Sequence, residues 1–438
     1  MMKKLLSSLA ALSLSVGVNA ADTTKQESKN SVCAYSNFLF EDPSFNFEAI
    51  RVLSESYYQA ADIGEVIYVV KNIKNGDMNE WGTEWEKRAD YIFKNAIKFN
   101  NEGNSIAAQN AYLRASNYYR SASFYMTSEK VRKKSVELRE KSVDCFLQYI
   151  KNKEFISQVK IPYENSYLPG YFIKSSKLKN GKAPLIIINT GFDGTKEEIC
   201  YQTGFAAALA GYNVLTFDGP GQGETIYKQK LFFRYDWEKV MTPAIDFAIT
   251  LPEVDKDKIA VYGISMGGYL IPRAAAFDKR IKACIANGGI YDLYAAFTHN
   301  MPKEFAELAF NDPTLFNKEI EEADQKIVVL NWFVGNGMWT FNVNTPSDLM
   351  RALKQYNLKG VSEKISCDTL IVNGTADTFM QGEAIKLYDN LKCKKTYMLF
   401  DDESTGELHC QLGALAISNE KIFTWLNNTF GYEPYSKL

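Results

Sequence analysis

Hydrophobic residues recur at spacings of three and four positions from about residue 46 to residue 151, a stretch without proline. The segment 81–99 shows this pattern clearly, because its apolar residues fall on one stripe of a helix: Trp81, Trp85, Ala89, Ile92, Phe93, Ala96 and Phe99. Such a stripe is typical of an amphipathic helix, and Thr83 with Glu86 forms a capping box at its predicted start. Further helices are predicted over 105–125 and 128–150. The sequence therefore predicts an all-helical domain over 21–152.

The pattern changes after about residue 155 to short apolar runs separated by turns and helical stretches. These runs cover 185–188, 213–217, 258–262, 281–286, 369–372 and 396–400. Continuous apolar runs of this length are typical of strands buried on both faces. Between them, helical periodicity covers 197–210, 236–250, 266–277, 381–391 and 412–427. The alternation predicts an α/β fold with a mostly parallel, doubly wound sheet over 153–438. A helix-like stretch with Trp332 and Trp339 is predicted to be an insertion at about 290–362.

Composition and charge exclude several classes of protein. The chain has 438 residues, 46% of them hydrophobic and 23% charged, as is usual for folded globular proteins. Its 50 basic and 52 acidic residues include no long basic run, so we expect no nucleic-acid partner. Only two histidines, His299 and His409, are present, and no C-x-x-C spacing occurs. We therefore expect neither a metal nor a cofactor.

The first residues have the features of a secretory signal peptide. Lys3 and Lys4 precede an apolar run over 5–18, and small residues lead to Ala20. We expect cleavage near Ala20, with 1–20 removed and the protein secreted or periplasmic. The alternative is a retained anchor, but the run is shorter than the roughly 18 residues that a membrane-spanning helix needs, so we expect no stable membrane insertion.

Seven cysteines follow this segment, so at least one thiol is unpaired or bridges to another chain. Cys367 and Cys393 each come directly before a predicted strand, and those two strands are candidates to be neighbours in the sheet. Since export would permit oxidation, we expect a disulfide between these two cysteines.

One serine has the setting of a nucleophile. Gly263 to Gly267 form a G-x-S-x-G pentapeptide around Ser265, after a predicted strand and before a predicted helix. This strand–turn–helix context is the one that a nucleophile elbow requires. The alternative is a tight Gly-Ser turn without chemistry.

A serine nucleophile needs a base and an acid that orients the base. In hydrolases of this architecture the chain order is serine, acid, histidine. His409 fits that order and His299 does not, because no late acid precedes His299. Asp377 follows a predicted buried strand and is the candidate acid, with Asp401 and Asp402 as rivals. The alternatives are a surface-loop histidine at 409 and a helix-capping role for Asp377.

Acyl transfer also needs two backbone N–H groups that face the developing oxyanion. One is expected from Met266, the residue after the nucleophile. The other is expected from the loop after an early strand, where Phe192 is the candidate. A second Gly-rich segment, 218–224, lacks the phosphate-loop pattern and is predicted to be a tight turn near the rim of the active site.

Several motifs in the same order resemble the FrsA-like α/β-hydrolases, the group that contains dihydroxypseudooxynicotine hydrolase and fungal enzymes that shorten naphthopyrone pigments. They are LPGYF, NTGFDGTKEE, FDGPGQGE, YGISMGGY, IANGGIYD and HCQLG, and the helical segment AYLRASNYYRSASFY is similar to the amino-terminal cap of that group. The resemblance implies an α/β-hydrolase fold with a helical cap, Ser265 as nucleophile, Asp377 as acid and His409 as base. In the nicotine-degrading relative a glutamate beyond the sixth core strand assists carbon–carbon cleavage, whereas this chain offers only Asp292 there.

These observations together predict a secreted serine hydrolase that cleaves an ester or amide bond in a small-molecule substrate. A carbon–carbon bond hydrolase and a serine peptidase are alternatives among enzymes, and a catalytically silent ligand-binding protein is the alternative from another class. A homodimer is considered alongside a monomer. We expect the helical cap to act as a lid that selects the substrate without supplying catalytic groups; in the alternative, its aromatic residues only form the core of its own helices.

Overall fold

The computed structural model describes Cys33 and residues 35–435. The predicted signal peptide lies outside these residues. In the part of the chain that is described, no helix has the length and apolar character needed to cross a bilayer.

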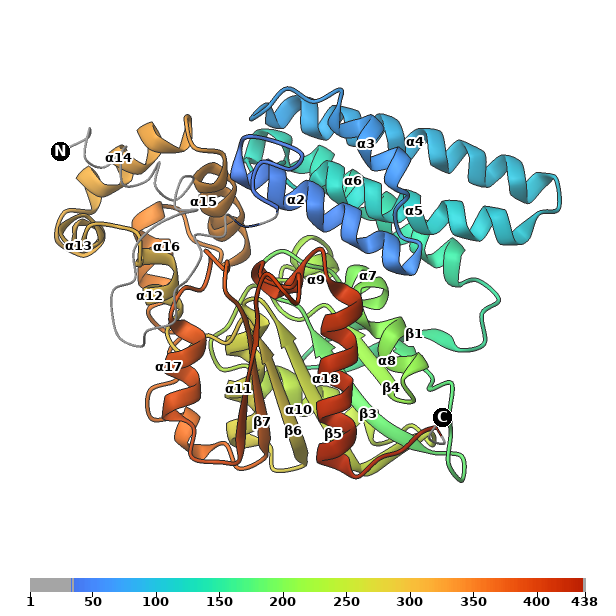
Figure 1. The fold of residues 1–438 in the computed structure, drawn as a ribbon. Coiled ribbons are helices and arrows are strands. Elements are labelled where there is room, and N and C mark those ends of the chain that lie inside the picture. Colours follow the sequence, from blue (N-terminus) through green and yellow to red (C-terminus); the bar gives the residue numbers. More distant parts are fainter. Residues whose placement is uncertain (1–32, 34, 436–438) are drawn as a thin grey trace.

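Helices form the first part of the described chain and lie across one edge of the sheet (Figure 1). They are α2 (Pro43–Ser54), η1 (Glu55–Tyr58), α3 (Ile63–Val70), α4 (Met78–Asn101), α5 (Ser105–Ser123) and α6 (Glu129–Ile150). We call these helices the cap.

The start of α4 differs from the prediction. The carboxylate of Asp77 accepts hydrogen bonds from the backbone N–H groups of Asn79 and Glu80 and so caps the helix. Thr83 lies inside α4, where its hydroxyl donates to the carbonyl of Asn79. The predicted capping box at Thr83 is therefore wrong, because Asp77, six residues earlier, already binds the free N–H groups at the start of the helix.

Most aromatic side chains of the cap pack against one another. Trp81 and Trp85 are fully buried, and their ring centroids lie 5.9 Å apart. Tyr118 contacts Trp85 and Tyr125 contacts Trp81, each with centroids 5.3 Å apart. For these residues the alternative interpretation holds, since they form the core of the cap itself. Phe124 is different, as described below.

In the described part of the chain the sheet has eight strands, in the order β1-β2-β4-β3-β5-β6-β7-β8. Their bounds are β1 (Ile156–Tyr163), β2 (Ser166–Ile173), β3 (Ala183–Asn189), β4 (Asn213–Phe217), β5 (Val254–Ile264), β6 (Ile281–Asn287), β7 (Asp368–Gly374) and β8 (Lys395–Phe400). The pairs from β4 to β8 are parallel, which confirms the predicted mostly parallel sheet. The β1–β2 and β2–β4 pairs are antiparallel and were not predicted.

Helices cover both faces of the sheet, and the side chains of successive residues in a strand point to opposite faces. In β3, Leu185 and Ile187 belong to one buried cluster and Ile186 and Ile188 to the other. The helices that follow the strands are α7 (Lys196–Ile199), a π-helical turn η2 (Cys200–Gly204), α8 (Phe205–Leu209), α9 (Gly223–Gln229), α10 (Glu238–Ala248), α11 (Gly267–Phe277), α17 (Glu383–Asn390), η4 (His409–Gln411) and α18 (Leu415–Phe430). Both faces of the central strands are therefore buried, as their apolar runs predicted.

A helical segment lies between β6 and β7, where the insertion was expected. It comprises α12 (Leu293–Thr298), α13 (Lys303–Asn311), α14 (Pro313–Asp324), α15 (Val328–Thr340), α16 (Pro346–Leu353) and η3 (Ser362–Lys364). These helices, orange in Figure 1, stand beside the cap at the same edge of the sheet. The ring of Trp332 in α15 stacks on Phe124 of the cap with centroids 5.2 Å apart. Cap and insertion therefore meet directly.

The expected disulfide between Cys367 and Cys393 is not present, and both thiols are free. The strands that follow them, β7 and β8, are neighbours as expected. However, the Sγ of Cys393 lies 3.5 Å from the hydroxyl of Thr369 and makes a hydrogen bond there. Adjacent strands are therefore not enough to join the two sulfur atoms.

Candidate active site

The candidate nucleophile lies in a strained turn between β5 and α11. Ser265 has a φ of +61°, a left-handed conformation that is costly for a residue with a side chain. Its N–H donates to the carbonyl of Asn287 over 2.9 Å, which ties the turn to the end of β6. A Cβ at Gly263 would lie 2.1 Å from the carbonyl oxygen of Gly267, so only glycine fits there. The turn has the geometry of a nucleophile elbow.

Ser265, His409 and Asp377 lie in one hydrogen-bonded row. The Nε2 atom of His409 is 2.9 Å from the Oγ of Ser265, and its Nδ1 is 2.6 Å from the Oδ2 of Asp377. The other oxygen of Asp377 accepts hydrogen bonds from the N–H groups of Phe379 and Met380. The structure therefore brings together the three residues that the sequence nominated.

Burial and charge act against each other in this row. Burial by itself would lower the pKa of His409, but the negative charge of Asp377, with smaller contributions from Cys410, raises that pKa well above its ordinary value. Burial likewise tends to raise the pKa of Asp377, and the charge and hydrogen bond of His409 outweigh it, so that this pKa is lowered. The buried pair favours a charged carboxylate beside an imidazole that binds protons strongly.

The rival residues are engaged elsewhere. The carboxylate of Asp401 accepts a hydrogen bond from the N–H of Ser404, and Asp402 is exposed. The Nδ1 atom of His299 is 2.6 Å from the carbonyl of Ala296, at the end of α12. Of the candidate acids, only Asp377 is hydrogen-bonded to His409.

The two candidate oxyanion donors lie on adjoining segments. A Cβ at Gly191 would be 2.6 Å from the backbone nitrogen of Met266, so the loop after β3 passes directly against the elbow. Within the described residues, neither Met266 nor Phe192 donates its backbone N–H to a protein acceptor. Met266 also precedes the N-terminus of α11, where the helix dipole favours negative charge. Both N–H groups therefore remain candidates for binding an oxyanion.

Three separate segments brace the loop that carries Phe192. The side-chain amide of Gln222, in the second Gly-rich turn, donates to the carbonyls of Thr190 and Gly191 over 2.8 and 3.0 Å. The insertion supplies Asn336, whose amide donates to the carbonyl of Phe192 over 3.0 Å. The cap supplies Arg51, which binds the carboxylate of Asp193 over 3.0 Å. The predicted turn at 218–224 therefore supports the active-site rim.

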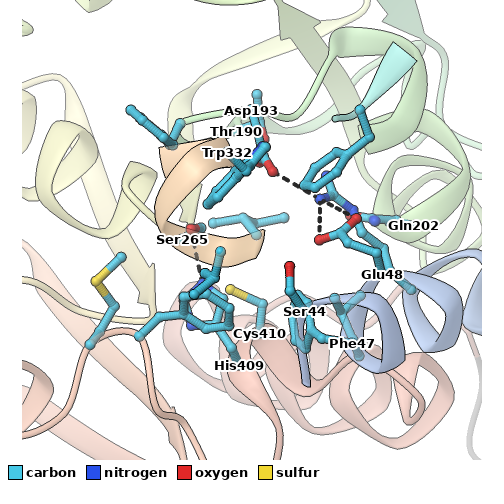
Figure 2. A pocket seen from close by; sticks show the side chains of 18 of the residues that line it. Ser44, Phe47, Glu48, Thr190, Asp193, Gln202, Ser265, Trp332, His409 and Cys410 are labelled. Carbon is cyan, nitrogen blue, oxygen red and sulfur yellow. Dashed lines mark hydrogen bonds and ion pairs between the residues drawn. The ribbon is translucent and has the colours of Figure 1, made fainter. Parts of the chain in front are cut away.

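A pocket opens above Ser265 and is lined by loops that follow strands of the sheet, by the cap and by the insertion (Figure 2). Its walls are largely aromatic and include Phe47, Phe124, Phe192, Phe297, Trp332 and Phe379. Polar residues of the cap also line it, namely Ser44, Glu48 and Arg51. No group of acidic, cysteine or histidine side chains suited to a metal ion occurs among the described residues.

Helix α2 supplies pocket residues that the sequence analysis missed. Ser44, Phe47, Glu48 and Arg51 are spaced at i, i+3, i+4 and i+7 and so share one face of the helix. The ring of Phe47 lies 6.4 Å from the His409 ring, which places α2 directly over the candidate triad. The available signals were Asp42 followed by proline, which mark a helix start, and a mixed aromatic and charged stripe after it.

Comparison with known proteins agrees with this geometry. The model of the alpha/beta hydrolase family matches residues 191–396. The hydrolase LUC6 of Fusarium sp. is 34% identical over 412 residues, which cover 90% of this chain and 98% of that protein. The 20-hydroxy-prefusarin hydrolase FUS2 of Gibberella moniliformis is also 34% identical, over 411 residues with the same coverage.

A solved structure has the same fold over nearly the whole chain. The crystal structure of 2,6-dihydroxy-pseudo-oxynicotine hydrolase matches with a TM-score of 0.67 at 19% identity, covering 88% of this chain and 99% of that one. This likeness includes the helices before the sheet. The identity and coverage of the curated relatives show that the chain is a hydrolase of the α/β-hydrolase family.

Proposed function

We propose that the protein is a serine hydrolase that cleaves an ester or amide bond in a small-molecule substrate through an acyl-enzyme intermediate. The observation that carries the proposal is the hydrogen-bonded row from Ser265 through His409 to Asp377, at a strained elbow beneath an aromatic pocket. Each member has the partner that its role requires.

In this mechanism the Oγ of Ser265 attacks the substrate carbonyl while the Nε2 of His409 accepts the hydroxyl proton. Asp377 orients the imidazole and stabilises its charged form. The N–H groups of Met266 and Phe192 bind the oxyanion of the tetrahedral intermediate. His409 then gives the proton to the leaving alcohol or amine, and the second half of the reaction repeats these steps with water as the nucleophile.

Ester or amide cleavage is favoured over carbon–carbon cleavage by the environment of Asp292. This residue caps α12, since one carboxylate oxygen accepts from the N–H of Ala295 and the other from the amide of Asn357. Asp292 does not line the pocket. The position from which the resemblance expected an additional acid therefore offers no free carboxylate to the substrate.

A panel of esters, aryl amides, short peptides and diketones tests the proposal, with Ser265→Ala as the matched control. We expect turnover of esters or amides by the native enzyme and a loss of several orders of magnitude in the variant. Turnover of diketones alone would instead support the carbon–carbon alternative, and turnover of peptides alone the peptidase. Saturable binding with no turnover in either protein would indicate a silent binding protein.

A further inference from the structure

A largely buried group of charged residues lies where α2 of the cap meets α7 and the loop before it. Arg51 binds Glu198 through two nitrogens, at 2.6 and 2.7 Å, and binds Asp193 at 3.0 Å. A second guanidinium, that of Arg120, lies 3.5 Å from Glu198 and 3.8 Å from Glu55. Among the described residues that make these contacts, and with Glu48 included, four carboxyl groups share two guanidinium groups.

Glu48 is weakly partnered and lines the pocket. Its two oxygens lie 3.4 and 3.3 Å from the same nitrogen of Arg51, which is longer than a well-formed charge-assisted hydrogen bond. That nitrogen is also the one that binds Asp193. The side chain of Glu48 is 7% exposed, so water has little access to form hydrogen bonds with its carboxylate oxygens. Burial, the largest influence, raises the pKa of Glu48 to about 7.

Two other polar side chains that line the pocket near Glu48 are already hydrogen-bonded. The hydroxyl of Ser44 is hydrogen-bonded to the hydroxyl of Tyr125 over 2.8 Å. Gln202 donates its amide to Glu55 and Glu198 over 2.9 and 3.1 Å. Figure 2 shows Glu48 on the opposite side of the pocket from Ser265 and His409. A substrate that reaches from the nucleophile across the pocket therefore meets a carboxyl group that can accept a hydrogen bond.

We propose that Glu48 is a specificity-determining residue that binds a hydrogen-bond donor of the substrate, at the far end of an aromatic or extended apolar body. This inference rests on the proposed function and extends it to a substrate class. The six aromatic residues of the pocket walls suit an apolar part of the substrate. The hydroxyl or amine of the substrate donates a hydrogen bond to the carboxylate of Glu48. A substrate without such a donor leaves a buried carboxyl group poorly partnered, which costs binding free energy.

Matched esters test this inference. Two series of aryl esters carry the same substituent either on the acyl ring or on the leaving alcohol, and in each series that substituent is methyl, hydroxymethyl or aminomethyl. We measure kcat/KM for the native enzyme, Glu48→Gln and Glu48→Leu, and compare the ratio of each donor ester to its methyl ester. Glu41→Gln is the matched control, because Glu41 is an exposed glutamate just before α2.

In the native enzyme we expect a donor-to-methyl ratio above one in at least one series, with a fall of about tenfold or more in Glu48→Leu. Glu48→Gln should retain part of the preference for the hydroxyl, since its amide oxygen still accepts, and lose the preference for the amine. Glu41→Gln should leave every ratio unchanged. Ratios that are the same in the native enzyme and in Glu48→Leu, or that never exceed one, would overturn the inference.

Labelling of Ser265 by a small fluorophosphonate separates this outcome from failure of the proposed function. Labelling at the same rate in the native enzyme and both Glu48 variants, together with unchanged ratios, would overturn only the role of Glu48. Absence of labelling in all of them would overturn the serine mechanism itself. Should Glu48→Leu not fold, the near-isosteric Glu48→Gln still decides the amine arm of the test.

Discussion

The side-chain amide of Asn336 donates to the backbone carbonyl of Phe192 over 3.0 Å, and both residues are buried. Asn336 belongs to α15 of the insertion, 144 positions away in the sequence. The N–H of the same Phe192 is the candidate oxyanion donor opposite Met266. The insertion is therefore more than a wall of the pocket, because it holds the peptide segment that we propose for oxyanion binding.

Asn336→Leu should lower kcat by about tenfold or more with a much smaller change in KM, because a displaced donor loses binding that is made mainly in the transition state. Thr340→Val is the matched control. Thr340 lies one turn further along α15 and its hydroxyl donates to the carbonyl of Asn336, so the variant perturbs the helix without touching Phe192. Steady-state measurements of kcat and KM for both variants on one ester test this prediction. An equal loss in the two variants would show that Asn336 acts only through the helix.

Asp377→Asn should reduce kcat/KM by about 10⁴-fold, as expected when a base loses the group that orients it. The pH dependence should also change. His409 must be neutral to accept a proton, so activity rises with pH and is lost as pH falls through the raised pKa of His409. Removing the charge of Asp377 leaves burial as the dominant influence, which lowers that pKa.

The residual activity of Asp377→Asn should therefore persist to lower pH than that of the native enzyme. Rate profiles of kcat/KM against pH measure this shift, and Asp401→Asn, which alters the rival acid, should leave both the rate and the profile unchanged. A profile that stays in place in Asp377→Asn while the rate falls would argue against electrostatic coupling between Asp377 and His409.

Phe124→Ala and Trp85→Ala should separate the two roles of the aromatic residues in the cap. Phe124 lines the pocket and stacks on Trp332, so its truncation should change the ratio of kcat/KM between bulky and small esters. Trp85 lies in the core of the cap, and its truncation should lower the free energy of unfolding by about 3–5 kcal/mol without changing that ratio. Urea unfolding and ester kinetics on both variants give the comparison. A selectivity change in Trp85→Ala alone would reverse this assignment.

The central sheet and the candidate triad could be predicted because their signals are local. Runs such as Leu185 to Ile188 are apolar at every position, as strands covered on both faces must be. The elbow around Ser265 needs glycine at fixed neighbouring positions, and the order of the three residues along the chain leaves few assignments. In these cases the residues that make a strand buried on both faces, or that allow the tight turn at the elbow, lie within a few positions of one another.

The missed features depend on contacts between distant segments or on weak patterns. Strand β1 has an alternating, partly exposed surface and contains Pro162, so it lacks the continuous apolar run used to recognise strands. The contacts of Arg51 with Asp193 and Glu198 span more than 140 positions, and no local pattern marks them. For Trp81 and Trp85 the stated alternative holds, since they form the core of the cap, because a helical bundle first needs a core of its own.

Export remains a prediction from Lys3, Lys4 and the apolar run that follows them. Protein recovered from its native host should begin near Ala21, because a signal peptidase cleaves after a small residue such as Ala20. Intact mass spectrometry checks this, with the unprocessed recombinant chain as the reference. Recovery of the full-length chain from the host would contradict it.

The most direct test of the serine mechanism is covalent labelling of the native enzyme with a fluorophosphonate, followed by peptide mass spectrometry. The reagent reacts with a serine only when a neighbouring base activates its hydroxyl. We predict one modified residue, Ser265, with labelling abolished in Ser265→Ala and strongly slowed in His409→Gln. An unlabelled Ser265 in folded protein, or equal labelling in the native enzyme and Ser265→Ala, would contradict the account.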